Sequence, residues 1–148
     1  MNNKILKKIS NFFTKQKDVV AVYLYGSRAK GEETNKSDLD LAILFKKPLT
    51  KYERILELSV EVQKVVGDVF FVDAREIYLS LSPVFLGEVI SSGRIVFCLD
   101  EGKRIKFEVE AMRIIDDSEQ IQRINLYYLK KSLKQGSYGR TKSSAKIT

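Results

Sequence analysis

The sequence contains no histidine, no tryptophan, a single cysteine and only 2 prolines among its 148 residues. Without histidine there is no imidazole base and no zinc cluster of the usual kind, and the lone Cys98 cannot form an internal disulfide. The longest unbroken apolar run, Val19 to Tyr25, is far shorter than the roughly 20 residues that a membrane span needs. The basic N-terminus lacks the apolar core of a signal peptide, so we expect a cytoplasmic protein with no membrane partner.

The composition is that of an ordinary globular domain, with 44% apolar and 30% charged residues. A chain of this length can bury roughly 70% of its unfolded surface, so it needs no disulfide or metal to fold. We expect a single domain over residues 1–135. The small polar residues that follow predict a disordered basic tail over 136–148.

The net charge of +7 would by itself favour nucleic-acid binding, but its distribution argues against this function. Residues 1–17 carry five lysines and no acid, and residues 136–148 carry three cations and no acid. Residues 18–135 therefore hold 18 basic and 19 acidic side chains. We interpret the basic ends as solvated surface and do not expect a nucleic-acid partner.

The hydrophobic pattern predicts helices alternating with short strands, and hence an α/β (α+β) fold with one mixed sheet. Thr50 and Glu53 predict a capping box at the start of a helix that ends near Gly67. Ser82 and Pro83 predict the start of another helix, and Asp117 with Gln120 predicts a capping box at the start of the last one. The expected strands cover 19–25, 38–45, 68–73 and 94–99, and the expected helices cover about 5–13, 50–66, 83–92, 102–115 and 118–135.

The most informative segment runs from Gly26 to Ile43. Asp38 and Asp40 lie two residues apart on an expected strand, so their carboxylates point to one face about 6.5 to 7 Å apart. Oxygen ligands without His or Cys suit Mg²⁺ or Mn²⁺, and two such ions can promote phosphoryl displacement. Gly26 and Ser27, directly after a buried strand, offer backbone N–H groups and a hydroxyl to phosphates, with Arg28 as a further phosphate contact.

A third carboxylate would complete a two-metal site, and Asp68 at the start of the third expected strand is the candidate. It could bind metal or take the proton of an attacking hydroxyl. A Gly-Asp pair between a helix and a strand is also a common turn, so the residues alone leave both interpretations open.

The motif G-S-x₁₀-D-x-D, formed by Gly26, Ser27, Asp38 and Asp40, resembles the signature of the polymerase-β-like nucleotidyltransferase superfamily. Over roughly residues 1–135 the chain resembles the minimal nucleotidyltransferases of the MNT type, which act as antitoxins beside HEPN-domain toxins. The closer resemblance lies in the small size, the helix before the first strand, the Ser82–Phe97 region and the terminal helix with Tyr127-Tyr128-Leu129.

The resemblance implies the polymerase-β-like fold and the transfer of AMP from ATP to a hydroxyl, with Mg²⁺ or Mn²⁺ as cofactor. Gly26 and Ser27 would hold the triphosphate, Asp38 and Asp40 would bind the metal, and Asp68 would be the third catalytic acid and metal ligand. The acceptor would be a tyrosine of a cognate HEPN RNase toxin that forms a complex with the antitoxin. The chain departs from the family in an insertion over 74–82, next to the expected acceptor surface.

Two alternatives remain open at this point. The chain could modify a small hydroxylated molecule such as an aminoglycoside, or it could be a non-catalytic antitoxin that only covers its toxin. Tyr127 and Tyr128 fit either an interface or a core, and we expect at least one of them in the core.

Overall fold

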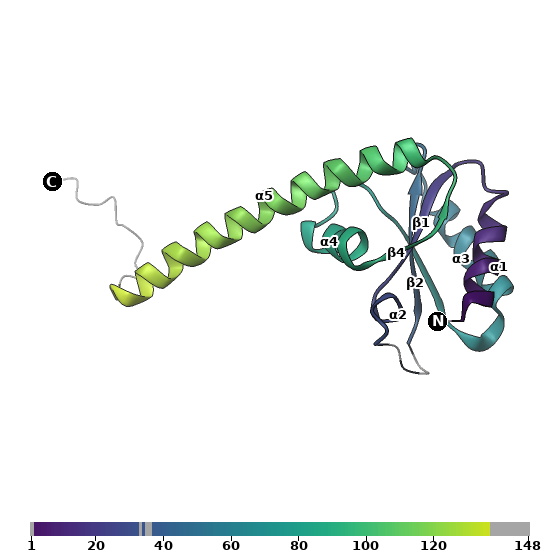
Figure 1. Cartoon of the computed structure of the whole chain (residues 1–148), viewed down its shortest axis with the longest axis horizontal. Helices are drawn as coiled ribbons and strands as arrows, with labels where there is room; N and C mark the ends of the chain where they lie inside the picture. Colours follow the sequence, from purple (N-terminus) through teal and green to yellow (C-terminus); the bar gives the residue numbers. More distant parts are fainter. Residues whose placement is uncertain (1, 33, 35–36, 137–148) are drawn as a thin grey trace. The chain divides into compact units, whose positions relative to one another are not determined.

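The computed structural model describes residues 2–32, 34 and 37–136, and the chain divides into two compact units, residues 1–115 and 116–148. Unit 1 begins with α1 (Asn3–Phe13), β1 (Val19–Tyr25), α2 (Ser27–Lys30), β2 (Leu39–Phe45) and α3 (Glu53–Val66). It continues with a 3₁₀ turn, η1 (Gly67–Val69), β3 (Val72–Glu76), α4 (Pro83–Ser92) and β4 (Arg94–Cys98). The long helix α5 (Glu101–Lys134) begins in this unit (Figure 1).

The four strands form one mixed sheet in the order β3-β2-β1-β4. β1 pairs antiparallel with both β2 and β4, whereas β2 and β3 run parallel. All seven residues of β1 are buried, as the unbroken apolar run Val19–Tyr25 predicts for a central strand. The mixed sheet with packed helices confirms the expected fold class.

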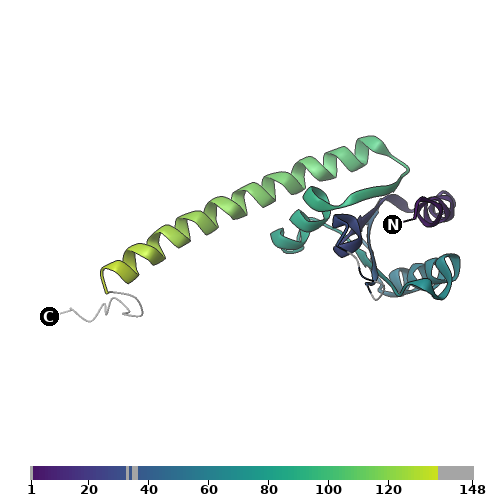
Figure 2. The same cartoon turned by 60° about the horizontal axis from the view of Figure 1, so that its bottom comes forward.

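Each face of the sheet is covered by helices, and alternate strand residues supply the two cores (Figures 1 and 2). α1 and α3 cover the face that carries Leu24 and Leu41. α4 and the first part of α5 cover the opposite face, which carries Tyr25 and Ala42. Because Asp40 alternates with Leu41, its side chain belongs to the second face.

Two predicted boundaries are wrong. Helix α3 begins at Glu53 after Tyr52, which makes no side-chain capping bond, so Thr50 and Glu53 form no capping box. The third strand covers Val72–Glu76 instead of 68–73, because residues 67–69 continue α3 as a 3₁₀ turn. By contrast, the Ser82 hydroxyl accepts a hydrogen bond from the Phe85 N–H at 3.1 Å, as the predicted start of α4 requires.

The two helices expected after β4 are one continuous helix, so the predicted capping box at 117–120 is wrong. No Gly or Pro interrupts residues 103–134. In unit 2 both Tyr127 and Tyr128 are exposed, at 62% and 59%, so neither belongs to a core. The predicted tail over 136–148 lies outside the described residues except for Gly136. Within the described part of the chain, no helix combines the length and the apolar character needed to cross a membrane.

Candidate active site

A row of three side chains crosses the sheet at one end of β1, β2 and β3. Tyr25 on β1 pairs with Asp40 on β2, and Asp40 pairs with Asp73 on β3. Side chains at paired positions share a face and lie close together. Asp38 comes just before β2, two residues from Asp40, and is exposed. The sheet therefore gathers carboxylates at the position that the Asp38-x-Asp40 spacing predicts.

The electrostatics of Asp40 reflect this crowding. Burial raises the pKa of the Asp40 carboxyl above its ordinary value, and the negative charges of Asp73 and Asp38 raise this pKa further. Arg75 acts in the opposite direction. Burial is also the main cause of the raised pKa of the neighbouring Tyr25 hydroxyl. The site holds its carboxylates against mutual repulsion, so a cation is the ligand that would relieve it.

Arg75 supplies part of this positive charge. Its Nη2 lies 3.2 Å from Asp73 Oδ2, and the interaction with Asp73 raises the pKa of the Arg75 guanidinium. The side chain of Arg75 is 60% exposed, so it can leave Asp73 without losing a packed environment. Asp73 can therefore exchange its arginine partner for another cation at small cost.

The turn between β1 and α2 lies directly against Asp40. Gly26 has φ 75°, a left-handed value that favours glycine, and a Cβ at this position would collide with the Asp40 carboxylate. Ser27 is the first residue of α2, where the N–H groups of a helix have no partner within the helix. The structure thus brings Gly26 and Ser27 to the carboxylate row.

Arg28 has a different environment from the one expected of a phosphate contact. It is 5% exposed, and its Nε donates to the carbonyl oxygens of Ser37 and Asp38, both at 3.1 Å. The guanidinium also stacks on Phe70, 4.0 Å from the ring centre. In this structure the Arg28 side chain holds the backbone that leads into β2, and its role as a phosphate contact stays a prediction.

The expected position of Asp68, at the start of the third strand, is wrong. Asp68 lies exposed in the 3₁₀ turn and outside β3, whereas Asp73 is the acid beside Asp40. The structure therefore favours Asp73 over Asp68 as the third carboxylate. The sequence does contain one signal for this assignment. Asp73 is an acidic residue between two apolar residues, Val72 and Ala74, which are both buried. A polar residue in such an apolar strand is typical of a functional site.

The donor set fits a hard divalent cation, because Asp38, Asp40 and Asp73 offer only oxygen atoms. The raised pKa of Asp40, caused first by burial and then by the charges of Asp73 and Asp38, points the same way. Among the described residues no three acidic, histidine or cysteine side chains are already arranged to hold a metal ion.

A four-stranded mixed sheet with a carboxylate row beside a glycine turn defines an α/β protein whose site suits a divalent cation and a phosphate group. The model of the family described as Polymerase beta, Nucleotidyltransferase matches residues 7–102, more than half of the chain. The chain therefore belongs to the polymerase beta nucleotidyltransferase family. Among curated proteins, none matches the sequence at a significant level.

Solved structures similar to this chain include a toxin-antitoxin with AMP-PNP, with a TM-score of 0.61 and 20% identity over 90% of this chain and 99% of that chain. Another is the tri-AMPylated Shewanella oneidensis HEPN toxin in complex with MNT antitoxin, with a TM-score of 0.61 and 19% identity over the same shares. A third, the toxin-antitoxin MntA-HepT, has a TM-score of 0.59 and 19% identity over 89% of this chain and 99% of that chain. These comparisons confirm the expected fold.

Proposed function

We propose that this protein is a metal-dependent adenylyltransferase that transfers AMP from ATP to a tyrosine of a cognate HEPN-domain toxin. The observation that carries the proposal is the row formed by Asp40 and Asp73, with Asp38 beside it, against the turn at Gly26. It joins a carboxylate cluster to a backbone that a phosphate can approach closely. The reaction would take place in the cytoplasm, where ATP is available.

The residues have separate tasks in this reaction. Gly26 and Ser27 hold the triphosphate through backbone N–H groups and the Ser27 hydroxyl. Asp38, Asp40 and Asp73 would hold Mg²⁺ or Mn²⁺, which neutralises phosphate charge and orients the displacement. Asp73, at the edge of the row, would accept the proton of the acceptor hydroxyl.

The transfer forms one bond to the α-phosphorus and breaks another. The acceptor oxygen forms a bond to the α-phosphorus of ATP, and the bond from that phosphorus to the bridging oxygen of the leaving group breaks. Pyrophosphate departs with the bonding electron pair. The hydroxyl proton passes to the Asp73 carboxylate and then to solvent.

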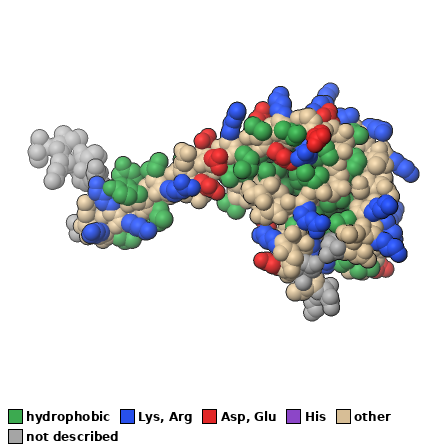
Figure 3. All heavy atoms as spheres, viewed as in Figure 1, with side chains coloured by type: hydrophobic (Ala, Val, Ile, Leu, Met, Phe, Trp, Pro, Cys, Tyr) green, Lys and Arg blue, Asp and Glu red, His purple; other side chains and the backbone are tan. Residues whose placement is uncertain are grey.

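A protein acceptor is supported by the surface of unit 2. Seven large apolar side chains are at least 38% exposed there, and Figure 3 shows hydrophobic side chains gathered on this part of α5. They are Ile121, Ile124, Leu126, Tyr127, Tyr128, Leu129 and Leu133. Exposed apolar surface of this kind marks a protein interaction site. A small-molecule acceptor would give no reason for it.

Charge and structural similarity add to this support. Residues 123–134 carry four cations (Arg123, Lys130, Lys131, Lys134) and no acid, so the partner surface should be acidic. A similar solved structure contains a HEPN toxin described as tri-AMPylated, in complex with an MNT antitoxin. By analogy, the acceptor of this chain is a protein that it also binds.

The experiment is intact-mass spectrometry of the protein encoded beside this one, after incubation with the wild-type protein, ATP and Mg²⁺. We expect the mass of that protein to rise by one or more AMP units. An Asp38→Asn, Asp40→Asn double variant should give no gain but should still bind the partner. A partner that is silenced without any mass gain, equally by the double variant, would show a purely binding antitoxin and refute the transfer reaction.

A further inference from the structure

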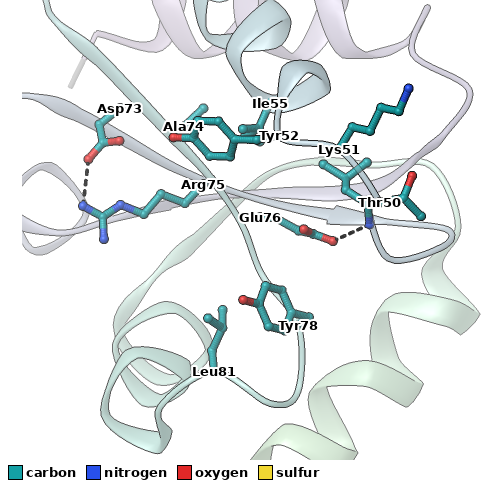
Figure 4. Close-up of a pocket in the computed structure, with 11 residues that line it drawn as sticks. Thr50, Lys51, Tyr52, Ile55, Asp73, Ala74, Arg75, Glu76, Tyr78 and Leu81 are labelled. Atoms are coloured by element: carbon teal, nitrogen blue, oxygen red, sulfur yellow. Dashed lines mark hydrogen bonds and ion pairs between the residues drawn. The ribbon is translucent and has the colours of Figure 1, made fainter.

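A cavity of about 500 Å³ lies along the outer edge of β3 (Figure 4). Four consecutive residues of the strand, 73–76, line it, so it follows the strand edge and not one face of the sheet. The loop before α3 and the segment after β3 complete the lining. The volume lies within the usual ligand range of roughly 300 to 1,000 Å³.

The cavity adjoins the carboxylate row, because Asp73 belongs to both. Across the sheet, the Gly26 turn follows β1, Asp40 lies on β2, Asp73 lies on β3, and the cavity lies beyond Asp73. In a phosphoryl displacement the attacking and leaving oxygens stand on opposite sides of the phosphorus. With the triphosphate at the Gly26 turn, pyrophosphate leaves toward β1, and the nucleophile arrives from the side of β3. The ribose of ATP does not lie on the line that joins the attacking oxygen, the phosphorus and the leaving oxygen. The cavity beyond β3 is therefore on the path of the acceptor and not on that of the ribose.

The lining is suited to an aromatic side chain. Leu49, Ile55 and Leu81 are apolar, and Tyr52 and Tyr78 present rings against which another ring can pack. These side chains come from the loop before α3, from α3 itself and from the segment after β3.

Two pairs of interacting groups line the cavity, and both are drawn as dashed lines in Figure 4. Glu76 accepts a hydrogen bond from the Leu49 N–H at 2.9 Å, which fixes the loop. Arg75 faces Asp73 at 3.2 Å, at the end of the cavity nearest the carboxylate row. A hydroxyl that enters along the apolar walls therefore meets Asp73 once Arg75 moves aside.

We propose that this cavity, the acceptor pocket, receives the tyrosine side chain that is modified and directs its hydroxyl to Asp73. This inference rests on the proposed function, since it assigns the acceptor subsite of that reaction. Tyr52 and Tyr78 hold the ring, and Arg75 is a positioning residue that covers Asp73 until the acceptor displaces it.

The first test uses N-acetyl-L-tyrosinamide as a probe of the wild-type chain, followed by amide NMR. We expect shift changes confined to the lining residues around 50–52 and 75–78. The Thr50→Trp variant, which places an indole in the exposed mouth of the acceptor pocket, should abolish these changes. Lys47→Trp, an equally exposed aromatic substitution outside the pocket lining, should preserve them. Absence of the changes in the wild type, or their persistence in Thr50→Trp, would overturn the assignment.

The second test separates acceptor from nucleotide. Thr50→Trp should lower the rate of AMP transfer to the partner protein by roughly 100-fold, since the nucleophile loses its position. Its affinity for AMP-PNP with Mg²⁺ should equal that of Lys47→Trp. Weaker AMP-PNP binding with an unchanged acceptor KM would mean that the pocket holds the base of the nucleotide and would refute the proposal. If the wild type transfers AMP to no protein, the proposed function fails, and the NMR result still decides whether the pocket binds a tyrosine.

Discussion

Replacement of Arg28 by methionine distinguishes a structural arginine from one that binds phosphate. The variant keeps a long side chain but removes the guanidinium that donates to the carbonyl oxygens of Ser37 and Asp38. It also removes the cation–π contact with Phe70. Because Arg28 is buried, water cannot replace these partners freely.

The magnitude follows from those contacts. A hydrogen bond to a charged group contributes roughly 1.5 to 3 kcal/mol, and a partly desolvated cation–π contact about 0.5 to 2 kcal/mol. After side-chain entropy is regained, we expect Arg28→Met to lower the free energy of unfolding by roughly 2 to 4 kcal/mol. Lys30→Met on the same helix is the control, since its exposed pair with Glu88 at 3.9 Å should contribute less than about 0.5 kcal/mol.

The assay is urea unfolding of the nucleotide-free proteins, followed by circular dichroism, with AMP-PNP affinity measured separately. A large loss of stability in Arg28→Met but not in Lys30→Met would support the structural role. The reasoning is refuted if Arg28→Met is as stable as the wild type without nucleotide and yet binds AMP-PNP much more weakly, because that is the behaviour of a phosphate contact.

Three further predictions concern stability. Gly93→Ala, at the residue just after α4, should destabilise the protein by roughly 1 to 3 kcal/mol, because a Cβ there would collide with the Val89 carbonyl. Gly87→Ala, inside α4, should stabilise it by about 0.5 to 1 kcal/mol, since the new Cβ would lie 3.9 Å from Ile115. Equal thermal shifts of the two variants would contradict this. Asp18→Asn should lower the free energy of unfolding by roughly 0.5 to 1 kcal/mol near neutral pH, because it breaks the pair with Arg54, which solvent screens at this half-exposed carboxylate. The hydrogen bond from Arg54 lowers the pKa of Asp18, so the difference should be full above the ordinary value of 3.8 and should fade as the pH falls through the lowered pKa. A difference that does not change with pH would contradict this. Asp40→Asn should raise the free energy of unfolding of the metal-free protein by roughly 0.5 to 2 kcal/mol near neutral pH, because the raised pKa of Asp40 means that its ionised form costs stability. This gain should shrink at acidic pH, where Asp40 is protonated. A variant that is less stable than the wild type at neutral pH would contradict this.

Local patterns predicted those parts of the fold that depend on neighbours in the chain. The apolar run Val19–Tyr25 forms β1 with the expected bounds, and Ser82 caps α4 as its position predicts. Gly26 follows β1 directly, as expected, and its positive φ and its close approach to Asp40 both require glycine.

The features that the sequence missed depend on contacts between distant segments. Asp73 reaches Asp40 only through the parallel pairing of β2 with β3, which the crossover through α3 establishes. Arg28 looked like a phosphate ligand because it follows Gly26-Ser27, but its burial is decided by Phe70 and by the backbone before β2. The capping pattern at 117–120 was overridden by helix-forming residues on both sides of it.

The central claim is that Asp40 and Asp73 form the catalytic pair of an AMP transferase. The most direct measurement compares Asp73→Asn with Asp68→Asn, using intact-mass spectrometry of the partner protein after incubation with ATP and Mg²⁺. The account predicts that Asp73→Asn transfers no AMP while Asp68→Asn transfers it at the wild-type rate. Loss of transfer in Asp68→Asn with retention in Asp73→Asn would contradict it.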